Sequence, residues 1–341
     1  MTDPDRDAEW IRPHLLPSTM PRDVPEALGL ATRLAPVARS LREDPRTYLA
    51  TLATLGAADL TTARAVEPHL DAVAILAQAG DPDLGPIGAG PGSTFGVYAA
   101  AAPGAGLRAR RVGAATRLTG TKAWCSLAAD VTHALVTTEP DESGRGGLHA
   151  IPLRHPGVTH AGSAWVARGL TAVTTGTLTL EDVPAVPVGE PGWYLDRPGF
   201  AWGGIGVAAV WFGGATALAA RLTEAARRRA PDQVALMHLG HVDRLLHGGG
   251  LALRDAAEAI AAGRADGPDG AVLAARVRAV VADAAEEVMR LVGHALGPAP
   301  LTHDEDHARR VADLTVYLRQ HHAERDLAAL GRLVLGPEPA P

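Results

Sequence analysis

Two stretches of the sequence carry side chains whose types and spacing could do chemistry. In the first, residues 120–126, a Gly-Thr-Lys turn leads into a short strand that carries Trp124, Cys125 and Ser126. A planar redox cofactor needs a broad aromatic face to lie against, with short polar groups and backbone N–H groups at its ring edge. The stretch therefore predicts a bed for a flat cofactor, and ordinary packing of a strand tryptophan is the alternative.

The second stretch lies near the C-terminus and contains Asp313, Tyr317 and His321. We expect one last long helix from residue 307 to about residue 334. Positions i, i+4 and i+8 share a helix face, so Tyr317 and His321 could meet. An imidazole with a pKa near ~6.5 can accept a proton at neutral pH. His321 is thus a candidate base, with Glu324 one turn on as the fallback, and a solvated histidine on a charged helix is the alternative.

A smaller polar cluster consists of Glu67, His69 and Asp71. We expect these residues at the start of a helix, where acidic and polar side chains cap N–H groups and complement the helix dipole. A functional role is the less favoured interpretation.

The elements that must position these residues fall into three regions. Residues 1–92 show helical periodicity, and Asp44-Pro45 is typical of a helix start. Residues 93–196 contain short strands between Gly, Pro and Asp turns, which predicts an antiparallel barrel or sandwich. Residues 197–341 are helical again, with Gly248-Gly249-Gly250 as a turn between helices. The expected fold is α+β and multidomain: an N-terminal helical domain, a small antiparallel β domain and a C-terminal domain like a four-helix bundle.

The composition of the chain argues against several classes of function and partner. The 341 residues carry a net charge of −6, so nucleic acid is not expected as a principal partner. The single Cys125 excludes an internal disulfide and suits a reducing cytoplasm. We expect no secretory signal and no metal site. The uncharged run at 199–220 contains several glycines, and we interpret it as a buried helix rather than a membrane span.

Several segments, in order, resemble the acyl-CoA dehydrogenase family of flavoproteins, which has this three-part layout. Those segments are the Leu-Gly-Ala-Ala-Asp-Leu run at 55–60, the Tyr and Pro-Gly-Ala-Gly loop at 98–106, residues 120–126, the Leu-Glu-Asp-Val-Pro exit at 180–184, the arginines at 227–229 and the Gly-rich turn at 293–297. The chain departs from the family pattern in its first flavin loop. Ala101-Ala102 stands where Thr-Glu is usual, and Leu107-Arg108 where Ser-Asp is usual.

The resemblance implies bound FAD and a role for each matching position. Trp124 would lie against the isoalloxazine, while Cys125 and Ser126 would meet its N5 edge. Arg228 would neutralise the pyrophosphate, usually that of a neighbouring subunit, so a homodimer or homotetramer is expected. The implied cofactor-binding residues are Tyr98, Ala101, Trp124, Cys125, Ser126, Arg228, Gly293 and Gly297.

The resemblance also implies a reaction. Family members remove a proton alpha to a thioester while hydride passes to flavin N5, and His321 stands where the usual glutamate base would be. A histidine there resembles the monooxygenase and oxidase branch. The substrate would be an acyl thioester or a small specialised metabolite, with an electron-transferring flavoprotein or O₂ as acceptor. A flavin-dependent monooxygenase, and a non-catalytic homologue with weakened cofactor binding, remain the alternatives.

Overall fold

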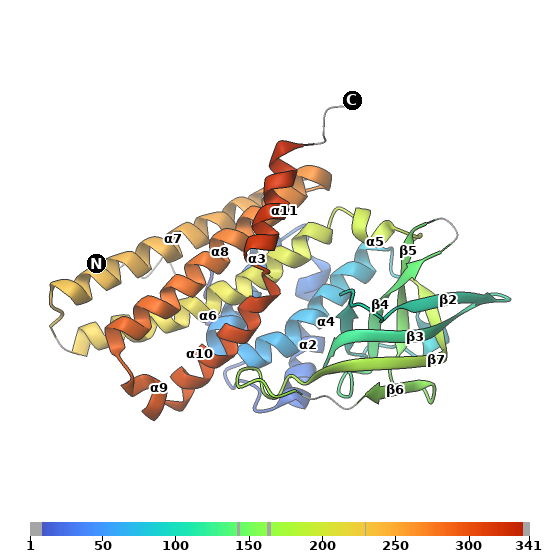
Figure 1. The fold of residues 1–341 in the computed structure, drawn as a ribbon, viewed down its shortest axis with the longest axis horizontal. Helices are drawn as coiled ribbons and strands as arrows, with labels where there is room; N and C mark the ends of the chain where they lie inside the picture. The colour runs from blue at the N-terminus through green and yellow to red at the C-terminus, as the bar shows by residue number, and fades with distance from the viewer. Residues whose placement is uncertain (1–8, 142–143, 162–164, 229, 337–341) are drawn as a thin grey trace.

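Helices form both ends of the chain and strands form its middle (Figure 1). The computed structural model describes residues 9–141, 144–161, 165–228 and 230–336. The elements before the sheet are η1 (Pro13–Leu15), α2 (Val24–Arg39), α3 (Pro45–Ala58), α4 (Leu60–Gln78) and η2 (Gly85–Ile87). Asp23, Asp44 and Asp59 cap α2, α3 and α4, because each carboxylate accepts a hydrogen bond from a backbone N–H of the first turn. The predicted helix start at Asp44-Pro45 is confirmed.

The capping interpretation of Glu67, His69 and Asp71 is wrong. The helix α4 begins at Leu60 with Asp59 as its N-cap, so these residues lie in its middle. Glu67 and His69 are buried there, which places a carboxyl group inside the protein.

The strands are β1 (Phe95–Tyr98), β2 (Leu107–Val112), β3 (Ala115–Ser126), β4 (His133–Pro140), β5 (Gly146–Pro152), β6 (Val158–Ala161) and β7 (Thr175–Pro187). They form one sheet in the order β1-β4-β5-β7-β3-β2, with β6 paired to β7. The long strand β7 joins the two halves, since it pairs with β3 over most of its length and with β5 at its end. Only the β1–β4 pairing is parallel among the described strands, so the sheet is mixed rather than purely antiparallel.

The C-terminal helices are α5 (Trp193–Asp196), α6 (Phe200–Arg228), α7 (Gln233–Ala261), α8 (Gly267–Leu296), α9 (Ala299–His303), α10 (Glu305–Tyr317), η3 (Leu318–Gln320) and α11 (Glu324–Leu335). The helices α6, α7 and α8 extend away from the sheet, and α4 lies between them and the strands (Figure 1). Two predictions for this region are wrong. The glycine triplet at 248–250 lies inside α7, and the expected last helix is interrupted between α10 and α11.

In the core, the helices α3 and α6 pack so closely that their backbones nearly touch. A Cβ on Gly213 would lie 1.9 Å from the carbonyl oxygen of Ala53, and one on Gly56 would lie 2.2 Å from that of Val210. Only glycine permits this approach. Among the described helices, α6 alone is long and apolar enough to cross a membrane, but 83% of its apolar window is buried inside the protein. The prediction of a buried core helix is confirmed.

Candidate active site

The strand β3 presents Trp124 in an unusual way. Its pairing with β7 shifts register between Lys122 and Cys125, and Trp124 lies within this bulge with a φ of 62°. The indole is 62% exposed. A bulky residue in the left-handed region costs on the order of 1–3 kcal/mol, and an exposed indole gains little from burial. The fold therefore holds a strained, open aromatic face at this point.

Four elements meet at Ser126, the last residue of β3. Its hydroxyl lies 2.9 Å from Oγ1 of Thr175 on β7 and accepts a hydrogen bond from Nη2 of Arg64 on α4 at 3.2 Å. Its carbonyl oxygen accepts a hydrogen bond from the hydroxyl of Tyr98 on β1 at 2.9 Å. Tyr98 itself is buried. The partly exposed Ser126 hydroxyl is thus fixed beside a guanidinium and two residues away from the indole.

Cys125 faces the opposite way from its two neighbours. The side chain is buried, and its Sγ donates to the carbonyl oxygen of Lys122 at 3.2 Å. Burial raises the pKa of the thiol to about 12, so it stays protonated and is no nucleophile at neutral pH. Only the backbone of Cys125 can address a ligand on the Trp124 side.

A second row of polar groups leads from Ser126 into the helices. Arg64 Nη1 lies 3.8 Å from Oε2 of Glu67, and the same oxygen accepts a hydrogen bond from the hydroxyl of Tyr317 at 3.3 Å. Glu67 and Tyr317 are 7% and 1% exposed. Burial raises the pKa of Glu67 to about 7, although the charge of Arg64 opposes this rise. We define Ser126, Arg64, Glu67 and Tyr317 as the polar row.

Sequence reasoning missed Arg64 as a functional candidate and favoured helix capping over a functional role for Glu67. The signal available in the sequence was the position of Glu67, four residues after Ala63 and three before Leu70. Both neighbours are buried on the apolar face of α4. A carboxyl group on such a face must be buried and partnered.

His321 lies outside the helix that was expected to carry it. The helix α10 ends at Tyr317, and His321 follows η3 with extended backbone. Its ring packs edge-on against Trp211 at 6.4 Å, and Nε2 lies 3.9 Å from Oδ2 of Asp326 with no hydrogen-bond partner. Burial lowers its pKa. The shared helix face is therefore wrong, and so is the solvated alternative, because His321 is only 7% exposed. Tyr317, not His321, bonds to Glu67.

The loop before β2 supplies no polar side chain to the Trp124 strand. Ala101 is exposed, and a tight turn is closed by the N–H of Ala105 donating to the carbonyl oxygen of Ala102 at 3.1 Å. The loop docks onto β3 because the N–H of Thr121 donates to the carbonyl oxygen of Gly106 at 3.0 Å. The loop can therefore offer backbone N–H and carbonyl groups to a ligand that lies beside β3.

Arg228, Gly293 and Gly297 are not brought to Trp124 within one chain. Arg228 ends α6, is exposed and pairs with Glu224. Gly293 lies inside α8 and Gly297 caps it, with open space where a Cβ would stand on either. The C-terminal ends of α6 and α8 lie at the end of the bundle away from the sheet (Figure 1).

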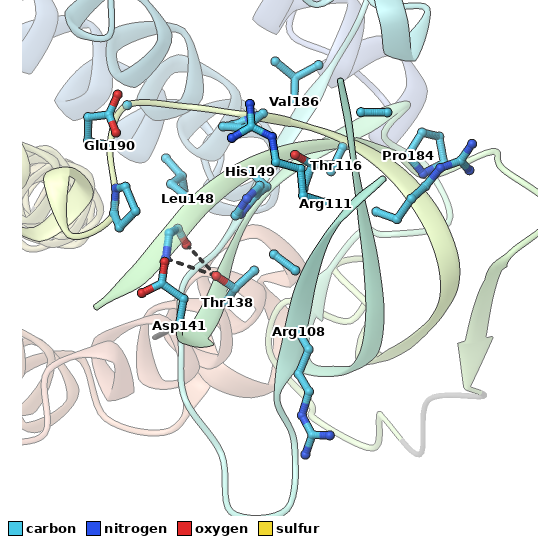
Figure 2. A pocket seen from close by; sticks show the side chains of 18 of the residues that line it. Arg108, Arg111, Thr116, Thr138, Asp141, Leu148, His149, Pro184, Val186 and Glu190 are labelled. Carbon is cyan, nitrogen blue, oxygen red and sulfur yellow. Dashed lines mark hydrogen bonds between the residues drawn. The ribbon is translucent and has the colours of Figure 1, made fainter. Parts of the chain in front are cut away.

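A cavity of about 1150 Å³ opens elsewhere, between β2 and β3 on one side and β5 and β7 on the other. Figure 2 shows Arg108, Arg111 and His149 on its walls. The described lining includes no Trp, Tyr or Phe and none of the predicted site residues. We therefore place the candidate active site at Trp124 and the polar row rather than in this cavity.

No protein-family model matches the sequence, and no curated protein matches it either. Solved structures do match. A putative acyl-CoA dehydrogenase from Mycobacterium smegmatis superposes with a TM-score of 0.77 at 15% identity, over 98% of this chain and 96% of its own. Butyryl-CoA dehydrogenase from Megasphaera elsdenii gives 0.70 at 17%, over 94% and 100%. FMN-bound TdsC from Paenibacillus sp. A11-2, a dibenzothiophene monooxygenase, gives 0.71 at 16%, over 92% and 99%.

The chain has the acyl-CoA dehydrogenase fold. The expected architecture is thereby confirmed, including its likeness to the monooxygenase branch. At these identities the comparison concerns the fold alone, so the fit of a flavin must be judged from the residues present.

The residues of this acyl-CoA dehydrogenase fold suit one end of a flavin better than the other. The open indole of Trp124 and the Ser126 hydroxyl match the face and edge of a flat ring system. Arg228 is the last residue of α6, and the C-terminal end of this helix lies at the end of the bundle away from the sheet (Figure 1). The described residues of one chain thus bring together groups that suit the ring system of a flavin, while Arg228, predicted to bind its pyrophosphate, lies at the other end of the bundle.

Proposed function

We propose that this chain is an FAD-dependent oxidoreductase whose isoalloxazine lies on Trp124, with the Ser126 hydroxyl at its N5 edge. The observation that carries the proposal is the exposed, left-handed Trp124 in the β3 bulge. Strain of this kind persists where the surrounding structure enforces it and is concentrated at functional sites. Binding of a flat ligand against the indole would account for a tryptophan that is exposed to solvent on a strained backbone.

The other residues take supporting roles in this proposal. Tyr98 holds the Ser126 carbonyl group and thereby fixes the end of β3. Cys125 and Ala101 contribute backbone groups only. Arg228, Gly293 and Gly297 of a second copy would bind the pyrophosphate of the cofactor, so we infer that the protein functions as a homodimer or homotetramer. The compartment that we propose for it is the cytoplasm.

The chemistry divides between the cofactor and the chain. When bound, the flavin supplies an acceptor for hydride at N5. We assign the substrate proton to His321: burial lowers the pKa of its imidazole, which favours the neutral form that a base needs, and its buried Nε2 has no hydrogen-bond partner among the described residues. The substrate is an acyl thioester or a small specialised metabolite, and an electron-transferring flavoprotein or O₂ is the final acceptor.

Two alternatives have a specific observation in their favour. A histidine rather than a carboxylate at the base position favours a flavin-dependent monooxygenase, and TdsC, which has a similar fold, is a dibenzothiophene monooxygenase. The loop at Ala101, which offers no polar side chain, favours a homologue that has lost tight flavin binding and serves as a partner subunit.

The test is the visible spectrum of the purified protein, before and after incubation with FAD or FMN and removal of free flavin. A flavin spectrum with FAD at one per chain, in a dimeric or tetrameric size-exclusion peak, supports the proposal. A colourless oligomer that takes up neither flavin refutes it and leaves the partner-subunit alternative. Turnover that requires both O₂ and reduced flavin separates the monooxygenase from the dehydrogenase.

A further inference from the structure

Arg64 is a guanidinium with unused hydrogen-bonding capacity at the edge of the proposed flavin bed. Its side chain is only 15% exposed. Among the described residues it makes one hydrogen bond, to Ser126, and one ion pair, to Glu67 at 3.8 Å, which is too long for a direct hydrogen bond. Its guanidinium also lies 5.7 Å from the centre of the Tyr317 ring. Since a guanidinium has five N–H donors, most of them are free for a ligand.

The charge that balances Arg64 is not permanent. Glu67 faces Arg64 and Asp71 on its own helix, Tyr317 on α10 and Arg278 on α8. Tyr48 on α3 and Tyr194 on α5 also face it. Burial raises the pKa of both Glu67 and Asp71, the former to about 7. Around neutral pH the negative charge that Glu67 offers to Arg64 is therefore only partly present.

We propose that Arg64 binds an anionic oxygen group of the ligand, a carboxylate or an ionised hydroxyl, and that this binding is coupled to uptake of one proton by Glu67. The geometry carries the inference, because one guanidinium contacts both the Ser126 hydroxyl and the buried Glu67 carboxyl. An anion on Arg64 would stand near the Glu67 carboxylate, and like charges in a buried site disfavour each other. The inference rests on the proposed function only in taking the Ser126 edge as the substrate side.

The coupling is a proton transfer without redox change. The incoming anion keeps its charge and displaces Glu67 as the counter-ion of Arg64. An O–H bond forms on Glu67, and the proton comes from solvent or buffer. The hydroxyl of Tyr317, which donates to Glu67, can turn to accept the new O–H hydrogen bond. The buried charge is thus the same before and after the ligand binds.

The experiment is isothermal titration calorimetry with benzoate as the anionic probe, from pH 6 to pH 8, in buffer pairs of different ionisation enthalpy. We expect uptake of nearly one proton per benzoate at pH 8 and nearly none at pH 6. With a pKa of about 7 for Glu67, the dissociation constant should rise about tenfold between pH 6 and pH 8, because only the protonated fraction binds well.

Two variants make the test specific. Glu67→Gln should bind benzoate with the same, tight dissociation constant at both pH values and without proton uptake. Glu181→Gln, which removes an exposed carboxyl group on β7, serves as the control, and its proton uptake should match that of the unmodified protein. Benzoate that does not bind, binds without proton uptake at pH 8, or keeps its pH dependence in Glu67→Gln overturns the inference.

The flavin content of the same samples separates this inference from the proposed function. A yellow protein whose benzoate binding is not coupled to protons refutes the inference alone. A protein that takes up no flavin, yet binds benzoate with proton uptake that Glu67→Gln abolishes, refutes the proposed function alone.

Discussion

Replacing Glu67 by glutamine should change how stability depends on pH. Burial raises the pKa of Glu67 from an ordinary 4.5 to about 7, so the folded state binds a proton that the unfolded state has released between these values. The stabilising effect of the raised pKa is fully present below pH 4.5 and is lost as pH rises through about 7. At about 1.36 kcal/mol for each pH unit between the two values, the loss is about 3 kcal/mol.

Glutamine keeps the shape of the side chain and cannot ionise. Relative to the unmodified protein, Glu67→Gln should therefore gain about 3 kcal/mol in free energy of unfolding between pH 4.5 and pH 8. The assay is urea unfolding followed by circular dichroism across this range, with the exposed Glu181→Gln on β7 as matched control. The control difference should stay constant with pH. A Glu67→Gln difference that is equally flat would show that Glu67 ionises as a solvated carboxyl and would refute the buried polar row.

Three further predictions concern single residues. Trp124→Asn should raise the free energy of urea unfolding by roughly 1 kcal/mol, because asparagine tolerates the left-handed backbone at 62°; a loss of stability would show that the indole packs well. Gly213→Ala should lower the melting temperature, through a loss of about 3 kcal/mol or more, because its Cβ would meet the Ala53 carbonyl oxygen. Gly240→Ala in α7, where the space is open, should raise it slightly; equal effects would contradict the close packing of α3 and α6. Cys125, with its pKa raised to about 12, should resist iodoacetamide at pH 8 until urea unfolds the protein, and prompt labelling measured by mass spectrometry would contradict its burial.

Features set by local sequence could be predicted well. The order of helices and strands, the helix start at Asp44 and the buried helix α6 follow from capping residues and hydrophobic periodicity. Trp124 was identified from its neighbours in the chain. Its exposure and left-handed backbone depend on the bulge against β7, which is a non-local pairing.

Features set by packing between distant segments could not be predicted. Glu67 owes its environment to Tyr317, which is distant in the sequence. The end of α10 has no glycine or proline signal; the chain leaves the helix where Arg278 on α8 donates to the carbonyl oxygen of Gln320, and it resumes at Ala323 with a φ of 47°.

The glycine triplet in α7 shows the same limit. Gly249 lies inside the helix, where an added Cβ would stand 3.2 Å from the Phe212 ring. Gly249 is thus explained by a close approach of α6 rather than by a turn, whereas an added Cβ on Gly248 would meet nothing within 4 Å. A glycine in a sequence does not show which of these two reasons applies.

The most direct measurement of the central claim is a titration of the flavin-free protein with FAD, followed by tryptophan and flavin fluorescence. The account predicts binding at one FAD per chain in the unmodified protein and in Trp193→Phe, with affinity reduced at least tenfold in Trp124→Ala. Unchanged affinity in Trp124→Ala, or no binding to any of the three, would contradict a flavin bed on β3.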